Sequence, residues 1–276
     1  MERLIDLEHL GNDRVIAACD LDGLIVDPGP SSCLENLLAG LEGEPRALLL
    51  THIHLDHAGA SGSLVRRFPD LRVYVHEIGA RHLIDPGKLL ESAGRLYGDD
   101  LERLWGEVAP VPAENVIALQ GGEDVEGLRV AHCPGHADHH VAYLDPSSGT
   151  AYVGDVAGVR IPPTEFTVAP TPPPDIDLAA WEESIRTIAA WRPERLLLTH
   201  FGPFDDVDGQ LAQVREALAR SAERARTRER GRFLADLESE IDRALDAETA
   251  VRLRQAAPPE QGWLGLERYW RKRSAT

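Results

Sequence analysis

Residues 51–59 contain four side chains that can bind a metal ion within six positions: His52, His54, Asp56 and His57. Two histidines separated by one residue project to the same side of an extended backbone, and we expect Asp56 and His57 to begin a following helix. An isolated histidine is usually an ordinary hydrogen-bonded residue, but His-x-His-x-Asp-His arises by chance in roughly one random-order sequence in a thousand. The segment therefore predicts a metal site.

Further metal-binding side chains come directly after predicted strands. The apolar run 47–50 predicts the strand that leads into the first two histidines. Later apolar runs predict strands over 128–133, 151–154 and 196–199, which lead into His136, Asp155 and His200, respectively. Imidazole and carboxylate groups without a cysteine cluster suit zinc, or another divalent metal such as iron or manganese. These seven donors are enough for two metal ions, and so many histidines are more typical of a catalytic site than of a structural one.

The remaining pattern predicts a layered α/β protein in which strands and helices alternate. Hydrophobic periodicity predicts a hairpin over 14–27, a helix over 58–68 and a helical excursion from the sheet over 78–105. A proline-rich loop is expected over 156–175, and a helix over 178–191 follows it. These elements are expected to bring the donors together at strand ends.

Past residue 202 the chain is predicted to be helical. Apolar residues spaced three and four apart mark two amphipathic helices, over 211–218 and 234–245. The charged stretch between them predicts a solvated helical face, and the prolines at 258–259 predict a short, partly frayed final segment. The two apolar stripes could form a homodimer or pack on the same chain, and we favour packing on the same chain.

Composition limits the classes of partner. At 276 residues and 43% hydrophobic, the chain can bury a full core. Its formal net charge of -17 repels phosphate backbones and anionic membranes, so nucleic acid is a disfavoured partner. No apolar run approaches the roughly 18–20 residues that span a bilayer, the first residues do not resemble a secretory signal, and the three cysteines form no paired framework. We therefore expect a cytoplasmic protein that acts on a small molecule.

Four motifs carry a family resemblance. They are Thr-His-Ile-His-Leu-Asp-His-Ala-Gly at 51–59, Cys-Pro-Gly-His at 133–136, Val-Gly-Asp at 153–155 and Leu-Thr-His-Phe-Gly at 198–202. In order and separation they resemble the metallo-β-lactamase superfamily, particularly its branch of hydroxyacylglutathione hydrolases (glyoxalase II). The resemblance implies an α/β fold, a four-layer αββα sandwich over residues 1–205, with residues 206–276 as a C-terminal helical extension.

The resemblance also implies a role for each donor. One metal ion would be held by His52, His54 and His136, a second by Asp56, His57 and His200, and Asp155 would bridge them. Zinc is the expected metal, with iron or manganese as alternatives. Two adjacent cations lower the pKa of a shared water, so that hydroxide forms at neutral pH and attacks an electrophilic centre. Asp56 is expected to orient that hydroxide or receive its proton, and Asp27 matches an early aspartate of the family that usually binds no metal.

Other residues are predicted to support the donors or to contact substrate. His132, His139 and His140 flank His136, and we expect them to form hydrogen bonds to the ligands more than to coordinate metal, with His140 as the best candidate. In this family the loops between strands shape the pocket, so the helical excursion and the proline-rich loop are its expected walls. The candidates for substrate contact in these walls are Arg160, Phe166, Tyr97 and Trp105.

The leading functional hypothesis is a hydrolase that uses a metal-activated hydroxide on a small thioester, ester or lactone. Two alternatives stay open: phosphodiester cleavage, as in ribonuclease-like relatives, and oxidation by a mononuclear iron enzyme such as a persulfide dioxygenase. The net charge of -17 argues against a nucleic-acid substrate. The flavin-linked diiron branch usually has glutamate in place of the second histidine, so His54 argues against that branch.

Overall fold

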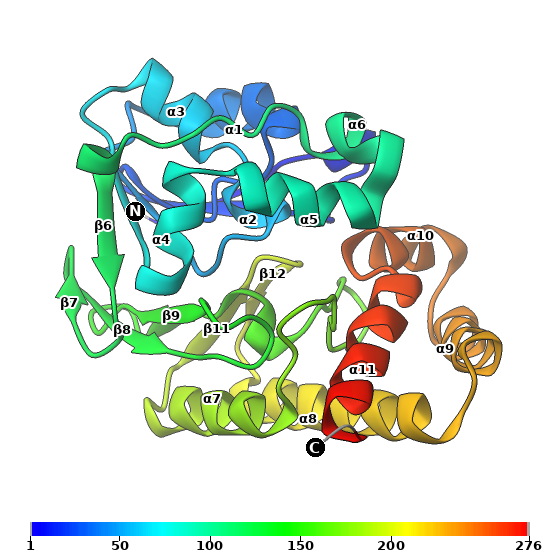
Figure 1. Ribbon diagram of the computed structural model, residues 1–276. Helices are drawn as coiled ribbons and strands as arrows, with labels where there is room; N and C mark the ends of the chain where they lie inside the picture. The colour runs from blue at the N-terminus through cyan, green and yellow to red at the C-terminus, as the bar shows by residue number, and fades with distance from the viewer. Residues whose placement is uncertain (1, 275–276) are drawn as a thin grey trace. The chain divides into compact units, whose positions relative to one another are not determined.

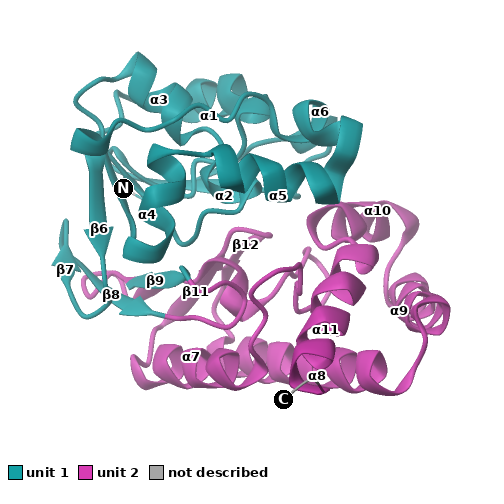
Figure 2. Cartoon of the chain, viewed as in Figure 1, with its two compact units in different colours: residues 1–132, 139–143 teal, residues 133–138, 144–276 magenta. Residues whose placement is uncertain are grey.

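The computed structural model describes residues 2–274 (Figure 1). Over these residues the fold is an α/β sandwich with two mixed six-stranded sheets and flanking helices, which confirms the predicted class. The chain divides into two compact units, shown in different colours in Figure 2. Unit 1 comprises residues 1–132 and 139–143, and unit 2 comprises residues 133–138 and 144–276. The predicted boundary at residue 205 stays a prediction.

The first sheet lies in unit 1 and follows the chain order from β1 to β6. Its strands are β1 (Glu2–Asp6), β2 (Ala17–Leu21), β3 (Leu24–Val26), β4 (Ala47–Leu49), β5 (Arg72–His76) and β6 (Val116–Leu119). The predicted hairpin is β2–β3, and its turn is fixed because Asp20 Oδ1 accepts a hydrogen bond of 2.7 Å from the Gly23 N–H. From β3 onward the neighbouring strands are parallel, so β4 delivers the chain to the carboxyl edge of the sheet.

Short helices connect the strands of unit 1. They are α1 (Leu34–Gly40), α2 (Leu55–Ala58), α3 (Ser61–Arg67), α4 (Glu77–Ile84), α5 (Gly87–Tyr97) and α6 (Leu101–Trp105). The helix predicted over 58–68 starts earlier, at Leu55, and is divided into α2 and α3 at Gly59 and Ala60. The predicted helical excursion is confirmed as α4–α6, inserted between β5 and β6.

The second sheet has the order β12-β11-β10-β9-β8-β7. Its strands are β7 (Asp124–Val125), β8 (Leu128–His132), β9 (Val141–Leu144), β10 (Thr150–Tyr152), β11 (Arg195–Leu198) and β12 (Gly202–Phe204). Every residue of β9 and β10 is buried, and β10 matches the strand that a short, continuous apolar run predicted over 151–154. In unit 2, β10 and β11 are parallel, and the chain between them contains the proline-rich loop and helix α7.

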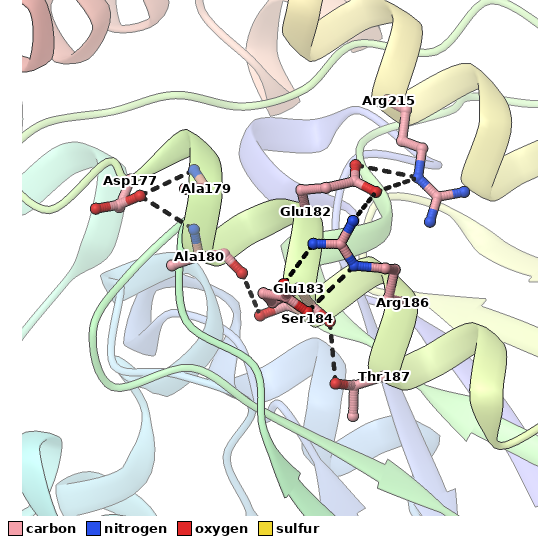
Figure 3. A network of polar contacts seen from close by, with 9 residues as sticks. All are labelled: Asp177, Ala179, Ala180, Glu182, Glu183, Ser184, Arg186, Thr187 and Arg215. Carbon is pink, nitrogen blue, oxygen red and sulfur yellow. Dashed lines mark hydrogen bonds and ion pairs between the residues drawn. The ribbon is translucent and has the colours of Figure 1, made fainter.

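Helix α7 (Leu178–Ala190) matches the helix predicted over 178–191. It begins at Asp177, whose side chain caps it by accepting hydrogen bonds from the Ala179 and Ala180 N–H groups (Figure 3). Its buried face includes Trp181, and its outer face carries ion pairs of Glu182 with Arg186 and with Arg215, a residue of the next helix (Figure 3). The helix therefore has one apolar and one charged side, as its periodicity predicts.

Four helices complete unit 2: α8 (Val207–Thr227), α9 (Arg230–Ala244), α10 (Ala247–Ala256) and α11 (Pro259–Ser274). The two predicted amphipathic segments lie in α8 and α9, but the prediction of a short, frayed end is wrong. Helix α11 has 16 residues and packs on α8, where Trp270 Nε1 donates a hydrogen bond of 2.9 Å to the Ala222 carbonyl. A proline at the first helical position favours a helix start. None of the helices within residues 2–274 is long and apolar enough to cross a membrane.

Candidate metal centre

The first donor set comprises His52, His54, Asp56 and His57, and it lies in unit 1 just after β4. His54 is the N-cap of α2, so Asp56 and His57 occupy its first turn as predicted. Nε2 of His52 lies 3.0 Å from Nδ1 of His54. Oδ2 of Asp56 lies 3.7 Å from Nε2 of His57. The four donors therefore form two close pairs on one short stretch of backbone.

A buried network around Asp27 orients two of these histidines. The Thr51 N–H donates to Asp27 Oδ1 at 2.8 Å, and the Thr51 hydroxyl donates to Oδ2 at 2.7 Å. His57 Nδ1 lies 2.8 Å from the same Oδ2, so the ring donates an N–H to this carboxylate. Because the Thr51 hydroxyl gives its hydrogen to Asp27, its oxygen accepts from His52 Nδ1 at 3.1 Å. Both rings thus carry hydrogen on Nδ1 and present the Nε2 lone pair, as metal-binding histidines commonly do.

Two histidines that follow the Cys-Pro-Gly-His motif, His139 and His140, also lie beside the first donor set. The buried ring of His140 stacks on that of His52, with 4.8 Å between ring centroids. His139 Nδ1 accepts a hydrogen bond of 3.3 Å from the N–H of Ile53, which lies between His52 and His54. His132 instead stacks on His76, at 4.0 Å. His139 is one of the three flanking histidines that were expected to form supporting hydrogen bonds, whereas no role was predicted for Thr51, whose only signal was its place at the start of the first motif.

The second donor set comprises His136, Asp155 and His200, and it lies in unit 2. Nε2 of His136 is 3.4 Å from Asp155 Oδ2, and Nε2 of His200 is 3.6 Å from Asp155 Oδ1. All three residues are buried. The carboxylate therefore turns one oxygen toward each imidazole, which is the arrangement that a bridging ligand requires.

Helix α7 supports two members of the second donor set at once. Trp181 Nε1 donates to the Val156 carbonyl at 2.8 Å, next to Asp155, and Ser184 Oγ donates to the Pro134 carbonyl at 2.6 Å, two residues before His136. Gly135 permits this approach because its φ is +128° and a Cβ there would lie 2.3 Å from the Trp181 nitrogen. One helix face consequently fixes both the His136 loop and the Asp155 turn.

The ring of His136 is held by the proline-rich loop. Its Nδ1 lies 2.9 Å from the Pro170 carbonyl oxygen, which can only accept, so Nδ1 carries the hydrogen. Nε2 therefore presents its lone pair on the side of Asp155. This ring has the same tautomer as His52 and His57, although its partner is main chain and not a side chain.

Distances within each donor set fit a divalent metal. Two ligand atoms that share a tetrahedral zinc ion lie about 3.4 Å apart, because zinc binds nitrogen and oxygen at about 2.0–2.1 Å. The separations of 3.0, 3.4, 3.6 and 3.7 Å agree with that value. Imidazole nitrogen and carboxylate oxygen suit zinc, iron and manganese alike. The His/Asp cluster is therefore suited to divalent metal, and its chemistry leaves the identity of the metal open.

Arg160, one of the predicted substrate contacts, forms hydrogen bonds to other residues of the protein. Arg160 Nε donates to the Thr164 carbonyl at 2.8 Å, Nη1 donates to Gln210 Oε1 at 3.2 Å, and the guanidinium lies 4.5 Å from the Phe204 ring centroid. These contacts occupy much of the Arg160 head group within unit 2. A substrate role for this residue stays a prediction.

The aromatic candidates have different surroundings. Trp105 is 7% exposed and stacks on His9, with 5.2 Å between centroids, and Tyr97 meets its ring edge-on at 5.2 Å. Phe166 is half-buried in the proline-rich loop. The burial of Trp105 favours a packing role, while direct substrate contact by any of the three stays a prediction.

Comparison with known proteins places this fold and donor set in a family. The family model of the metallo-beta-lactamase superfamily matches residues 20–200, and the chain belongs to that superfamily, whose members are generally metal-dependent hydrolases. The crystal structure of an archaeal superfamily member from Sulfolobus tokodaii has a TM-score of 0.71 at 23% identity, covering 96% of this chain and 97% of that one. A structure determined in a di-iron-bound form has a TM-score of 0.53 at 27% identity, covering 77% of this chain and 90% of that one.

Curated relatives match shorter stretches. A metallo-beta-lactamase fold-containing protein of Sulfurisphaera tokodaii is 29% identical over 162 residues, which are 56% of this chain and 60% of that protein. A hydroxyacylglutathione hydrolase of Aeromonas hydrophila is 31% identical over 136 residues, which are 48% of this chain and 41% of that protein. The chain thus spans about half the length of these relatives. These partial matches confirm the predicted resemblance to hydroxyacylglutathione hydrolases.

Proposed function

We propose that the protein is a hydrolase that binds two divalent metal ions and cleaves a small thioester, ester or lactone. The observation that carries this proposal is the Asp155 carboxylate, which turns one oxygen toward His136 and the other toward His200. A carboxylate with both oxygens committed in this way suits a pair of cations more than a single one. The relatives named hydroxyacylglutathione hydrolase support an acyl substrate.

The proposed assignment draws on both donor sets and follows the family pattern. One ion would be held by His52, His54 and His136, the other would be held by Asp56, His57 and His200, and Asp155 would serve both. Zinc is the first choice. The relative with a di-iron-bound structure makes iron the first alternative, with manganese after it.

Asp56, Asp27 and Thr51 have different roles in the proposed hydrolysis. When bound, the metal ions would acidify a water molecule and polarise the acyl oxygen. Asp56 is the most accessible carboxylate of the donor sets, with its side chain 20% exposed against 6% for Asp155, and we assign it to accept the proton of the attacking water. Asp27 keeps the His57 ring in the ligand tautomer, and Thr51 does the same for His52. No side chain needs to act as a covalent nucleophile.

Metal-defined protein and a substrate panel test the proposal. The protein would be freed of metal, reconstituted separately with zinc, iron or manganese, and assayed with S-acyl glutathiones, lactones, aryl phosphodiesters and a β-lactam. We expect about two ions per chain and the highest kcat/KM on an acyl compound. One iron per chain, with oxygen consumption in the presence of glutathione persulfide, would replace hydrolysis by oxidation. Preferential cleavage of the phosphodiester would also contradict the acyl assignment.

A further inference from the structure

The loop segment that orients His136 is poor in main-chain hydrogen-bond donors. Pro170 supplies the carbonyl that accepts a hydrogen bond of 2.9 Å from His136 Nδ1, and residues 172–174 are three further prolines. Proline has no N–H group, so the regular hydrogen bonds of a sheet or a helix cannot hold this segment. Other contacts must fix the Pro170 carbonyl, because a hydrogen bond weakens when its two atoms move apart.

The C-terminal helix α11 supplies such contacts, within the same unit of the chain. Thr171 follows Pro170 and is only 2% exposed, and its Oγ1 donates a hydrogen bond of 3.0 Å to the Gly262 carbonyl of α11. Further along the helix, Arg268 Nε donates to the Pro174 carbonyl at 3.2 Å. The proline-rich segment is therefore bound to α11 at both of its ends.

Gly265 allows α11 to approach the loop this closely. A Cβ at this buried position would lie 2.0 Å from the Thr171 carbonyl oxygen and 2.8 Å from the Pro172 carbonyl carbon. Real Cβ atoms essentially never come within 3.0 Å of such atoms, so any side chain would force the helix and the loop apart. The φ of Gly265 lies outside the left-handed region. The need for glycine therefore comes from this contact and not from the backbone conformation.

Helix α11 is held more firmly than the loop, because it is anchored on both α8 and α9 (Figure 1). Trp270 Nε1 donates a hydrogen bond to the Ala222 carbonyl of α8. The ring of Trp263 packs on Phe233 of α9, with 5.4 Å between ring centroids, and Leu266 between these contacts is fully buried. A disturbance between the helix and the proline-rich segment should therefore move the segment.

We propose that Gly265 is a positioning residue for the candidate metal centre, because the α11 contact that it permits fixes the carbonyl that orients His136. The contacts lead from α11 to Thr171, along the main chain to Pro170, and from its carbonyl to the imidazole ring. The inference rests on the proposed metal-dependent function and gives a C-terminal helix a part in it. Loss of an outer hydrogen-bond partner of a ligand lowers metal affinity about 10–100-fold.

Two alanine variants of α11 form a matched pair that tests the contact. Gly265→Ala and Gly262→Ala both lie in this helix, and both raise helix propensity. At Gly262 the added Cβ would lie 3.5 Å from Thr171 Oγ1, an ordinary contact, so only Gly265→Ala displaces the loop. We expect zinc affinity, measured by competition with a chelator, to fall about tenfold or more in Gly265→Ala and to stay unchanged in Gly262→Ala.

An NMR experiment separates positioning from general destabilisation. The Nδ1–H proton of His136 gives a downfield signal while the Pro170 carbonyl accepts it. The Nδ1–H proton of His57, which is donated to Asp27 in unit 1, is an internal reference. In both metal-free and zinc-loaded protein, we expect Gly265→Ala to remove or broaden the His136 signal and to leave the His57 signal unchanged. Loss of both signals, or retention of both, would overturn the proposal.

Variants of Thr171 provide a second test that adds no volume to α11. Thr171→Val removes the hydrogen bond to the Gly262 carbonyl, and we expect it to broaden the His136 signal and weaken zinc binding several-fold. Thr171→Ser keeps the hydroxyl and should restore both. Circular dichroism would show which variants fold. If Gly265→Ala does not fold, an unchanged His136 signal in Thr171→Val would overturn the proposal.

The positioning role and the hydrolase proposal fail in different ways, because the NMR and chelator measurements need no substrate. If the wild-type protein hydrolyses acyl compounds but every folded variant keeps the His136 signal and full zinc affinity, the positioning role is wrong and the hydrolase stands. If no acyl compound is hydrolysed while Gly265→Ala alone of the matched pair loses the His136 signal, the positioning role stands and the acyl assignment is wrong.

Discussion

The two donor sets are built in opposite ways. The first set occupies residues 52–57 and is oriented by side chains, chiefly Asp27 and Thr51. The second set comes from three separate places in the chain and is oriented largely by main-chain contacts, including the carbonyl of Pro170. The first set therefore depends on the identities of a few residues, whereas the second depends on the correct packing of whole elements, above all α7.

Removing Asp155, the proposed shared ligand, should have the largest effect. In Asp155→Ala both imidazoles of the second donor set lose their common carboxylate. Loss of an outer hydrogen-bond partner costs about 10–100-fold in metal affinity or activity, so loss of a ligand to both ions should exceed a hundredfold in kcat/KM. Metal content by mass spectrometry should fall as well. Full metal content together with full activity would rule out the two-metal scheme.

Asp27→Asn tests how far the first donor set depends on one side chain. The carboxylate uses one oxygen for the Thr51 N–H and the other for the Thr51 hydroxyl and His57 Nδ1. An amide offers only one acceptor, so at least one of these contacts breaks. We expect metal affinity to fall about 10–100-fold, measured by competition with a chelator. Asp22→Asn, at the exposed tip of the same hairpin, should leave affinity unchanged.

Gly135→Ala tests the dependence of the second donor set on packing. The added Cβ would meet the Trp181 main chain at 2.3–2.4 Å, so either α7 or the His136 loop must shift. Gly127→Ala is a matched control, because φ there is also positive, at +87°, but nothing lies within 4 Å. Urea unfolding should show about 1–3 kcal/mol more destabilisation for Gly135→Ala than for the control. If both variants lost the same free energy of unfolding, the strain of a positive φ alone would explain the loss, and contact with Trp181 would not contribute.

The outer face of α7 should contribute least. Glu182 pairs with Arg186 and Arg215 near the surface (Figure 3), and its side chain is 38% exposed. Exposed ion pairs contribute about 0–1 kcal/mol, so Glu182→Gln should lower the free energy of unfolding by no more than that, and less at high salt. Metal affinity should not change. A measurable loss of metal would show that the ion pairs also position the buried face.

The same contrast explains which features could be predicted from the sequence. The first donor set could be predicted because its four residues lie within six positions of the sequence. His136, Asp155 and His200 could be predicted because each follows a short apolar run that folds as a strand. Strands β1, β6, β7 and β12 and helix α10 were not predicted, and α11 was predicted only as a short, frayed segment. Local pattern is weak in these elements, so tertiary packing must stabilise them. The Pro170 carbonyl that accepts the hydrogen bond from His136 could not be predicted from the sequence. Every residue has a carbonyl, and only the path of the whole loop places this one beside the ring.

That main-chain acceptor has a consequence for mutational tolerance. The carbonyls at positions 134, 156 and 170 anchor the second donor set through Ser184, Trp181 and His136, respectively. Every amino acid supplies the same oxygen, so the acceptor itself does not depend on the residue type, and only packing restricts these positions: Val156 and Pro170 are buried, whereas Pro134 is half-buried. A saturation library should therefore accept more residue types at Pro134 than at Asp27 or Thr51. A comparison of residue types among sequences would therefore not reveal the main-chain acceptors that position the second donor set.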